Sequence, residues 1–161
     1  MGGVLMPYGL GHLIGCDTHD VGGYLDGTPK RETAPGISKL RTARVMEEGM
    51  VMTSEPGCYF INALIDRALA NPQQAKYINT KEVNRLRGFG GVRLEDVVLV
   101  TADGVENLTT APRTVEEVES VRAGGPWPPA IDTCPALKRK WYTLGVKGEG
   151  MIPLPVLIQE E

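Results

Sequence analysis

The sequence lacks the features of a membrane protein, a secreted protein and a nucleic-acid-binding protein. Its longest uninterrupted aliphatic run covers only residues 97–100, whereas a helix that spans a bilayer needs about 20 apolar residues. The N-terminus has neither the basic region nor the small-residue cleavage site of a secretory signal. The 17 basic residues are outnumbered by 20 acidic ones, and they form no basic stripe of the kind that binds a phosphate backbone. We therefore expect neither a membrane nor a nucleic acid as a partner.

Cysteine is scarce and shows no pairing pattern. The three cysteines, Cys16, Cys58 and Cys134, are odd in number and far apart, and no two have the spacing of a metal site. Disulfides persist in oxidising compartments and are rare in the cytosol. The cysteine pattern therefore predicts a cytoplasmic protein.

Glycine and proline are abundant instead, with 20 and 12 of the 161 residues, whereas average usage would give about 12% for the two together. This composition excludes a long-helix bundle or a coiled coil and favours short strands joined by loops. The length corresponds to about one domain. Because the composition shifts at Gly124, after which 11 of the last 38 residues are Gly or Pro, we divide the chain into a domain at residues 1–123 and an extension at residues 124–161.

Short strand and helix patterns are mixed along the chain. They predict strands at residues 50–55, 58–61 and within 92–100, a hairpin that turns at 103–104, and helices at 62–70, 73–87 and 114–123. Pro56 ends the first strand because proline cannot continue a ladder. Thr114 and Glu117 form the capping box of the last helix. Since strands and helices do not alternate regularly, an α+β fold is predicted.

Four short segments concentrate polar residues that could perform chemistry. They are GLGH at residues 9–12, THDVGG at 18–23, SEPG at 54–57 and GVRLED at 91–96. Each places a His or Glu beside glycine or proline, where a side chain is held firmly and space remains for an ion or a substrate. Taken singly, a histidine in a glycine-rich loop is more often structural.

Glu95 is the most unusual of these residues, because it lies within a valine-rich strand pattern. A buried carboxylate costs several kcal/mol unless a cation compensates it. Arg93 points to the same side of the strand, since side chains alternate with a period of two. Either Arg93 or a metal ion could therefore compensate Glu95.

The order and wording of the four segments resemble the C-terminal half of the Xaa-Pro dipeptidase (prolidase) branch of the pita-bread metallopeptidases. The resemblance runs from residue 2 to about residue 123 and includes LRTAR, RGFGGVRLED and APRTVEE. It implies a curved antiparallel sheet with flanking helices. It also implies hydrolysis of dipeptides with a C-terminal proline at a dinuclear metal site. The alternatives are an inactive relative that binds peptides or proteins, and an orphan half-domain that dimerises.

The resemblance assigns roles to individual residues. The family has five metal ligands, two Asp, one His and two Glu, of which His12, Glu55 and the bridging Glu95 match three. His19 matches a histidine on the substrate side, and Arg41 of LRTAR matches the arginine that contacts the substrate carboxylate. The catalytic residues that the resemblance implies are His19, Glu55 and Arg93, and Arg93 matches an arginine that orients the bridging glutamate. Two Mn²⁺ ions suit such a carboxylate-rich site.

Two departures from the family pattern concern the ligands. The two Asp ligands belong to the first half of the fold, and Asp17, Asp20 and Asp26 lie in the wrong segment to replace them. Tyr8 stands where the family usually has a histidine. We therefore expect this chain to bind at most one Mn²⁺, weakly. We also expect it to form a homodimer or to associate with the missing N-terminal half.

Overall fold

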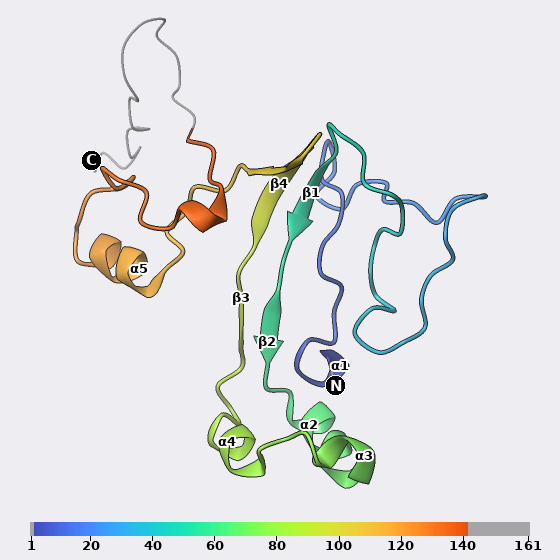
Figure 1. Ribbon diagram of the computed structural model, residues 1–161. Helices are drawn as coiled ribbons and strands as arrows, with labels where there is room; N and C mark the ends of the chain where they lie inside the picture. Colours follow the sequence, from blue (N-terminus) through green and yellow to red (C-terminus); the bar gives the residue numbers. More distant parts are fainter. Residues whose placement is uncertain (1, 142–161) are drawn as a thin grey trace, which may run out of the picture.

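Two short antiparallel sheets form the centre of the computed structural model, which describes residues 2–141 (Figure 1). The three-stranded sheet has the order β1-β4-β5, and the two-stranded sheet pairs β2 with β3. The strands are β1 (Val51–Ser54), β2 (Gly57–Tyr59), β3 (Gly91–Arg93), β4 (Asp96–Thr101) and β5 (Gly104–Asn107). Figure 1 shows β1 and β2 following each other along one line, beside β4 and β3.

The two ladders share one register across a break. Ser54 pairs with Asp96 on one side of the break, and Gly57 pairs with Arg93 on the other. The two residue numbers of each pair have the same sum, so neither strand has an extra residue between the two ladders. Pro56 has no N–H to donate, but its carbonyl oxygen accepts a hydrogen bond from the Leu94 N–H at 3.0 Å. The interruption therefore leaves opposite residues facing each other.

The predicted strands are confirmed with small changes. The second strand begins at Gly57 and ends at Tyr59, instead of covering residues 58–61. The pattern within residues 92–100 is split between β3 and β4. The predicted hairpin joins β4 to β5, where Thr101 pairs with Gly104, so the turn lies one residue earlier than expected.

The helices flank the two ends of this ladder. They are α1 (Gly2–Leu5), α2 (Asn62–Ala70), α3 (Pro72–Ala75), α4 (Thr80–Arg85) and α5 (Val115–Arg122). The single helix predicted at residues 73–87 is wrong, because α3 and α4 divide that segment. Asn79 has an extended backbone and its side chain accepts the Glu82 N–H, so it begins a new helix. The capping box of Thr114 and Glu117 is confirmed at α5. No helix among residues 2–141 has the length and apolarity to cross a membrane.

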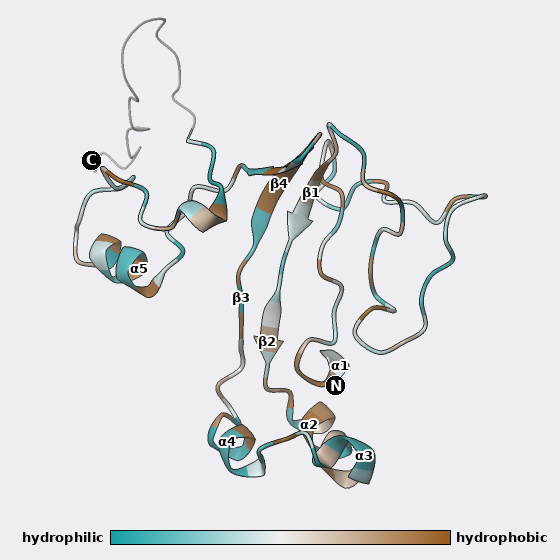
Figure 2. Ribbon diagram, viewed as in Figure 1, coloured by the Kyte–Doolittle hydropathy of each residue, from teal (hydrophilic) through white to brown (hydrophobic). Residues whose placement is uncertain are grey.

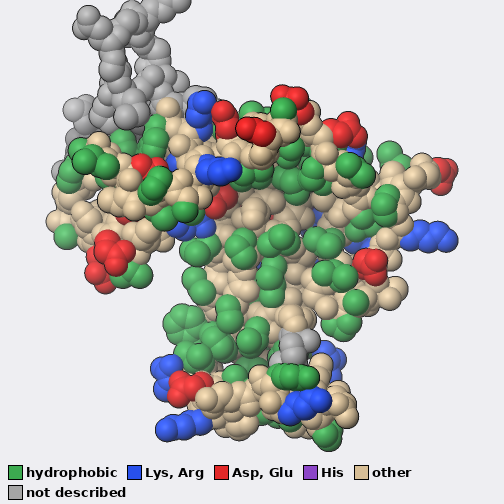
Figure 3. All heavy atoms as spheres, viewed as in Figure 1, with side chains coloured by type: hydrophobic (Ala, Val, Ile, Leu, Met, Phe, Trp, Pro, Cys, Tyr) green, Lys and Arg blue, Asp and Glu red, His purple; other side chains and the backbone are tan. Residues whose placement is uncertain are grey.

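Few apolar side chains are buried. Ile65 and Ala68 of α2, with Val4 of α1, make up the buried hydrophobic residues of the described chain. The strand β4 carries apolar residues (Figure 2). Val92 of β3 and Leu94, between β3 and β4, are nevertheless 51% and 46% exposed. Hydrophobic side chains accordingly gather on the visible face of Figure 3 above α2–α4. A face of this kind is typical of an interaction surface.

The described part of the predicted extension packs against α5 and β5. Arg139 forms a parallel bridge with Asn107 of β5, and its guanidinium donates to both carboxylate oxygens of Glu117 at 2.8 and 3.1 Å. It also pairs with Asp132 and lies 5.0 Å from the ring centre of Trp141. The division of the chain at residue 123 remains a prediction. Residues 142–161 of the extension lie outside the described residues.

This cluster predicts acid-dependent stability. The buried Arg139 guanidinium, helped by backbone N–H donors, lowers the pKa of the Glu117 carboxyl from 4.5 to about 2. A carboxyl whose pKa is lower in the folded chain than in the unfolded chain stabilises the fold at pH values above the unfolded pKa. This contribution is lost as the pH falls toward the folded pKa. We expect Glu117 to withdraw on the order of 3 kcal/mol between pH 4.5 and 2. Urea unfolding followed by tryptophan fluorescence over this range measures it. The variant Glu117→Gln should lose that part of the pH slope, and an unchanged slope would contradict the assignment.

Candidate active site

Glu55 and Glu95 are brought together by the shared register of the ladders. Glu55 follows β1 and Glu95 precedes β4, and the continuous numbering places them opposite each other at the break. Directly opposed residues of antiparallel strands have Cβ atoms about 4.5–5.5 Å apart. Two carboxylates at this spacing repel each other unless a cation lies between them. The break in the sheet therefore has the chemistry of a cation site.

His12 is brought to the same place by a segment that runs beside β1. The Thr53 N–H donates to the His12 carbonyl at 2.8 Å, and the Glu55 N–H donates to the Leu10 carbonyl at 2.6 Å. Gly11 allows this approach, since a Cβ at that position would lie 1.9 Å from the Thr53 carbonyl oxygen. The glycine of GLGH thus permits the backbone contact that sets the histidine beside Glu55.

The three side chains form a cluster with ligand geometry. One donor atom from each of His12, Glu55 and Glu95 lies within 4.8 Å of the other two, and this is the only such cluster among residues 2–141. His12 Nε2 lies 3.0 Å from Glu55 Oε1, and both side chains are buried. Glu95 is exposed.

The donors of this cluster fit a divalent cation. His12 Nδ1 lies 2.9 Å from the Leu13 carbonyl oxygen, which can only accept, so Nδ1 carries the proton. In the neutral ring, Nε2 then presents its lone pair to Glu55 Oε1, and two lone pairs face each other. A second proton or a cation must separate them. Orientation of a ligating imidazole by a carbonyl on its other nitrogen is common in metal sites, and nitrogen with carboxylate oxygen suits Mn²⁺ or Zn²⁺.

Two neighbours hold the Glu55 carboxylate in place. The Thr53 hydroxyl donates to Oε1 at 2.6 Å, and Arg93 Nη1 donates to Oε2 at 2.6 Å. Arg93 Nε also donates to the Tyr59 hydroxyl at 2.5 Å, and this bond is the main cause that raises the Arg93 pKa above its usual value. Arg93 thus stays cationic and fixes the orientation of Glu55.

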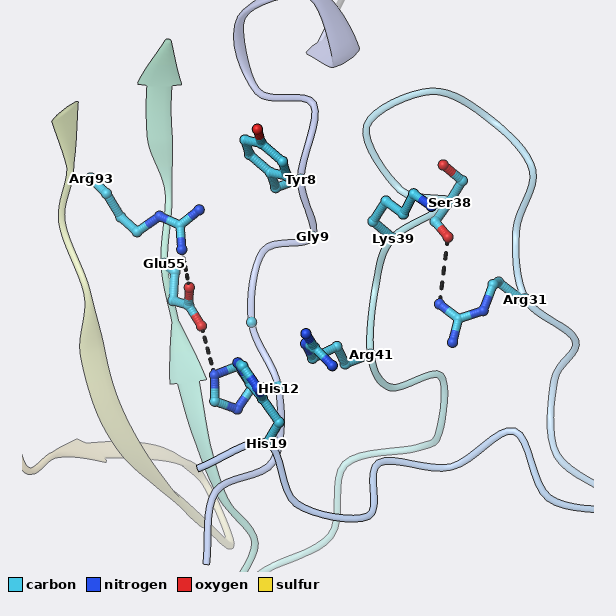
Figure 4. Close-up of a pocket in the computed structure, with 11 residues that line it drawn as sticks. Tyr8, Gly9, His12, His19, Arg31, Ser38, Lys39, Arg41, Glu55 and Arg93 are labelled. Carbon is cyan, nitrogen blue, oxygen red and sulfur yellow. Dashed lines mark hydrogen bonds and ion pairs between the residues drawn. The ribbon is translucent and has the colours of Figure 1, made fainter. Parts of the chain in front are cut away.

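A cavity of about 550 Å³ opens in front of the cluster (Figure 4). His12, Glu55 and Arg93 lie on one side of it, and Arg31, Ser38, Lys39 and Arg41 line the other. The His19 ring meets the His12 ring edge to face, with centroids 4.5 Å apart. One side therefore offers ligand atoms for a metal ion, and the other offers positively charged side chains for an anionic group.

Comparison with known proteins identifies the family. The model of metallopeptidase family M24 matches residues 2–102. The Xaa-Pro dipeptidase of Homo sapiens is 55% identical over 124 residues, which cover 77% of this chain and 25% of that protein. This chain belongs to metallopeptidase family M24. The α+β class and the pita-bread fold predicted from the sequence are thereby confirmed, and the family implies a divalent metal.

Other relatives are similar over the same part of the chain. A probable Xaa-Pro aminopeptidase of Penicillium rubens is 47% identical over 116 residues, which cover 71% of this chain and 24% of that protein. A solved structure of Escherichia coli aminopeptidase P is 31% identical over 76% of this chain and 21% of that chain, with a TM-score of 0.49. The chain thus spans about a quarter of the length of the curated relatives it matches.

The six predicted site residues of this M24 chain lie close together in the structure. His12, His19, Arg41, Glu55 and Arg93 line one cavity, and Glu95 completes the ligand cluster at its edge. The expected burial of Glu95 is wrong, because the ladder is interrupted beside it and no described residue covers it. Arg93 pairs with Glu55 instead of Glu95.

Sequence reasoning also missed part of the cavity. Tyr8, noted as a departure from the family, lines the cavity and places its ring edge to face on Tyr59, with centroids 5.6 Å apart. Arg31 and Lys39 line the cationic side but carry no motif of their own. Asp17, Asp20 and Asp26 do not join the ligand cluster of the described chain.

Proposed function

We propose that this chain carries the His, Glu and substrate-binding part of the active site of a Xaa-Pro dipeptidase. Such an enzyme hydrolyses dipeptides with a C-terminal proline at a dinuclear metal site. The observation that carries this proposal is the cavity with the His12–Glu55–Glu95 cluster on one side and cationic side chains on the other. A small peptide presents its scissile amide and its carboxylate to two such sides.

The proposed ligands are His12, Glu55 and Glu95, with Mn²⁺ as the ion. Two bound ions would supply an activated water and polarise the scissile carbonyl. The chain's own residues prepare the site for this chemistry. Thr53 and Arg93 each hold one oxygen of the Glu55 carboxylate, so that the carboxylate is oriented before any ligand arrives. We assign a catalytic role to Glu55 on this basis.

The substrate-side roles belong to His19 and Arg41. Arg41 lines the cavity opposite the ligands, and a guanidinium offers the planar fork that binds a carboxylate through two hydrogen bonds. His19 lies against His12, where its imidazole can donate a hydrogen bond to the oxygen of the scissile carbonyl. Arg93 contributes by positioning Glu55, since its guanidinium is already bonded to that carboxylate.

The second candidate is an inactive relative that binds peptides. It is favoured by the ligand count, because the described chain supplies three of the five ligands that the resemblance implies. The two candidates differ in whether a further segment supplies the two aspartates. In the enzyme, such a segment or another copy of the chain would cover exposed apolar residues in and after β3, which include Val92 and Leu94. A cytoplasmic location is consistent with the three free cysteines.

A metal titration tests the ligand assignment. The three donors suffice for one ion, so we expect one weak Mn²⁺ site per chain, measured by titration calorimetry and by electron paramagnetic resonance of free Mn²⁺. Glu55→Gln removes the negative charge of the carboxylate that faces His12 Nε2, and it should abolish Mn²⁺ binding. Glu119→Gln, on the exposed side of α5, is the matched control and should bind normally. Two tight, equivalent sites in the unaltered chain, or unchanged binding by Glu55→Gln, would contradict the assignment.

A further inference from the structure

The segment that carries Arg41 has no secondary structure of its own. Residues 39–42 belong to no helix or strand, and among residues 2–141 no hydrogen bond or ion pair holds the Arg41 guanidinium. In Figure 4 the Arg41 side chain lies on the side of the cavity opposite Glu55. The position of the guanidinium therefore depends on the backbone of Arg41, which is set by the planar peptide groups before and after this residue.

The peptide group before Arg41 is held through the Leu40 carbonyl. The Tyr24 hydroxyl donates to this oxygen at 2.9 Å, and Arg31 Nη1 donates to it as well. The Arg31 guanidinium also lies 4.0 Å from the centre of the Tyr24 ring, which is a cation–π distance. Because the peptide group is planar, the two donors also orient the Arg41 nitrogen.

The peptide group after Arg41 is held by the same part of the chain. A Cβ at Gly22 would lie 2.4 Å from the Arg41 carbonyl oxygen, so the two backbones are in contact there. The Thr42 hydroxyl donates to the Gly22 carbonyl, and Thr42 is buried. Residues 22–31 thus hold both peptide groups of Arg41, as the precise placement of a binding side chain requires.

Tyr24 adopts a backbone conformation that its side chain disfavours. Its φ is 63°, in the left-handed region where a bulky residue is strained and glycine is favoured. Strain of this kind persists only where the surrounding contacts determine the conformation. Glycine would adopt this φ without strain, but it has no hydroxyl to reach the Leu40 carbonyl. A tyrosine at this position therefore indicates that its side chain has a role that outweighs the strain.

We propose that Tyr24 is a positioning residue, which raises the affinity for the substrate carboxylate by orienting the peptide group of Arg41. The inference rests on the proposed function, in which Arg41 binds that carboxylate. Tyr24 is not among the residues that line the cavity, so it acts on a ligand through Arg41. Arg31 does line the cavity and can contact a ligand itself, so Tyr24 is the residue to replace.

Binding of a dipeptide with and without its carboxylate tests the inference. The full chain in EDTA is titrated with Gly-Pro and with glycyl-prolinamide, and dissociation constants are measured from NMR chemical shifts. Tyr24→Phe keeps the ring that contacts Arg31 and removes only the hydroxyl. It should weaken Gly-Pro binding about three- to fivefold, as expected for the loss of one neutral hydrogen bond, and leave binding of the amide unchanged. Tyr77→Phe, at an exposed tyrosine outside the cavity, is the matched control and should bind both ligands normally.

A double-mutant cycle separates positioning of Arg41 from a general structural effect. If Tyr24 acts through Arg41, Tyr24→Phe should have no further effect on Gly-Pro binding when Arg41→Met is present. Unchanged Gly-Pro binding by Tyr24→Phe, or equal weakening of Gly-Pro and its amide, would overturn the inference. The same weakening in the Arg41→Met background would overturn it as well. If instead Arg41→Met binds Gly-Pro as tightly as the unaltered chain, or the unaltered chain does not bind Gly-Pro, the proposed function itself is contradicted.

Discussion

The 161-residue chain supplied with Mn²⁺ is expected to release no measurable proline from Gly-Pro, and to become active when a segment with two aspartate ligands is added. The reason is the number of ligands: His12, Glu55 and Glu95 suffice for one ion, and only Glu95 is assigned as a bridge to a second. Loss of one element of electrostatic stabilisation typically lowers the rate by about 10²–10³. Binding of the dipeptide should persist, because Arg41 and His19 are present in the cavity.

The measurement is proline release in the presence and absence of the added segment. Glu95→Gln should prevent the recovery of activity, whereas Glu119→Gln should recover as fully as the unaltered chain. The opposite result would be strong turnover by the chain alone that Glu95→Gln abolishes. It would mean that a ligand set other than the one proposed operates in these residues.

The candidate site was predictable from the sequence because its residues lie in short, glycine- or proline-containing segments. GLGH and SEPG specify local geometry: Gly11 allows the backbone contact with β1, and Pro56 marks the break in the ladder. The strand patterns also predicted that Glu55 lies at the end of a strand, whereas Glu95 was expected within one. Their opposition depends on the register of two ladders, which is set by pairing between distant residues and was not predicted.

One error concerns a local signal, and the others arose where contacts between distant residues decide the structure. The helix at residues 73–87 was predicted from composition, but the side chain of Asn79 begins a new helix there. Arg93 was considered as a partner of Glu95 because the two are neighbours in the sequence. In the folded chain, Arg93 reaches across the ladder to Glu55, and this contact cannot be inferred from strand periodicity. Lys39 belongs to a turn whose position beside the cavity depends on contacts with Gly9 and Tyr24.

The C-terminal segment shows the same limit most clearly. Its high Gly and Pro content is typical of disorder, yet residues 124–141 surround a buried arginine. The signal in the sequence was weak, because Trp127 and Asp132 stand alone among prolines and Arg139 lies between two lysines. Their meaning appears only when α5 supplies Glu117 as the partner of Arg139.

Replacement of Arg139 by methionine is expected to destabilise the chain by about 3–5 kcal/mol, because it leaves buried carboxylates without their cation. The Arg139 side chain is 1% exposed and that of Glu117 is 5% exposed, so water cannot take the place of the guanidinium. The bridge to Asn107 would weaken as well. For a chain of this size, the loss corresponds to a fall of about 10 °C in Tm. Thermal unfolding followed by calorimetry and by the fluorescence of Trp127 measures it.

Arg122→Met provides the matched control for this prediction, because Arg122 is an exposed arginine on α5 and its replacement should change Tm by about 1 °C or less. A second variant separates the loss of charge compensation from the loss of packing. If unpaired carboxylates cause the damage, Arg139→Met combined with Glu117→Gln should be more stable than Arg139→Met alone. Equal stability of the two variants would assign the effect to the contacts of Arg139 with the Trp127 and Trp141 rings, at 5.7 and 5.0 Å. A Tm for Arg139→Met that equals the Tm of the unaltered chain would show that residues 124–141 do not stabilise α5 and β5.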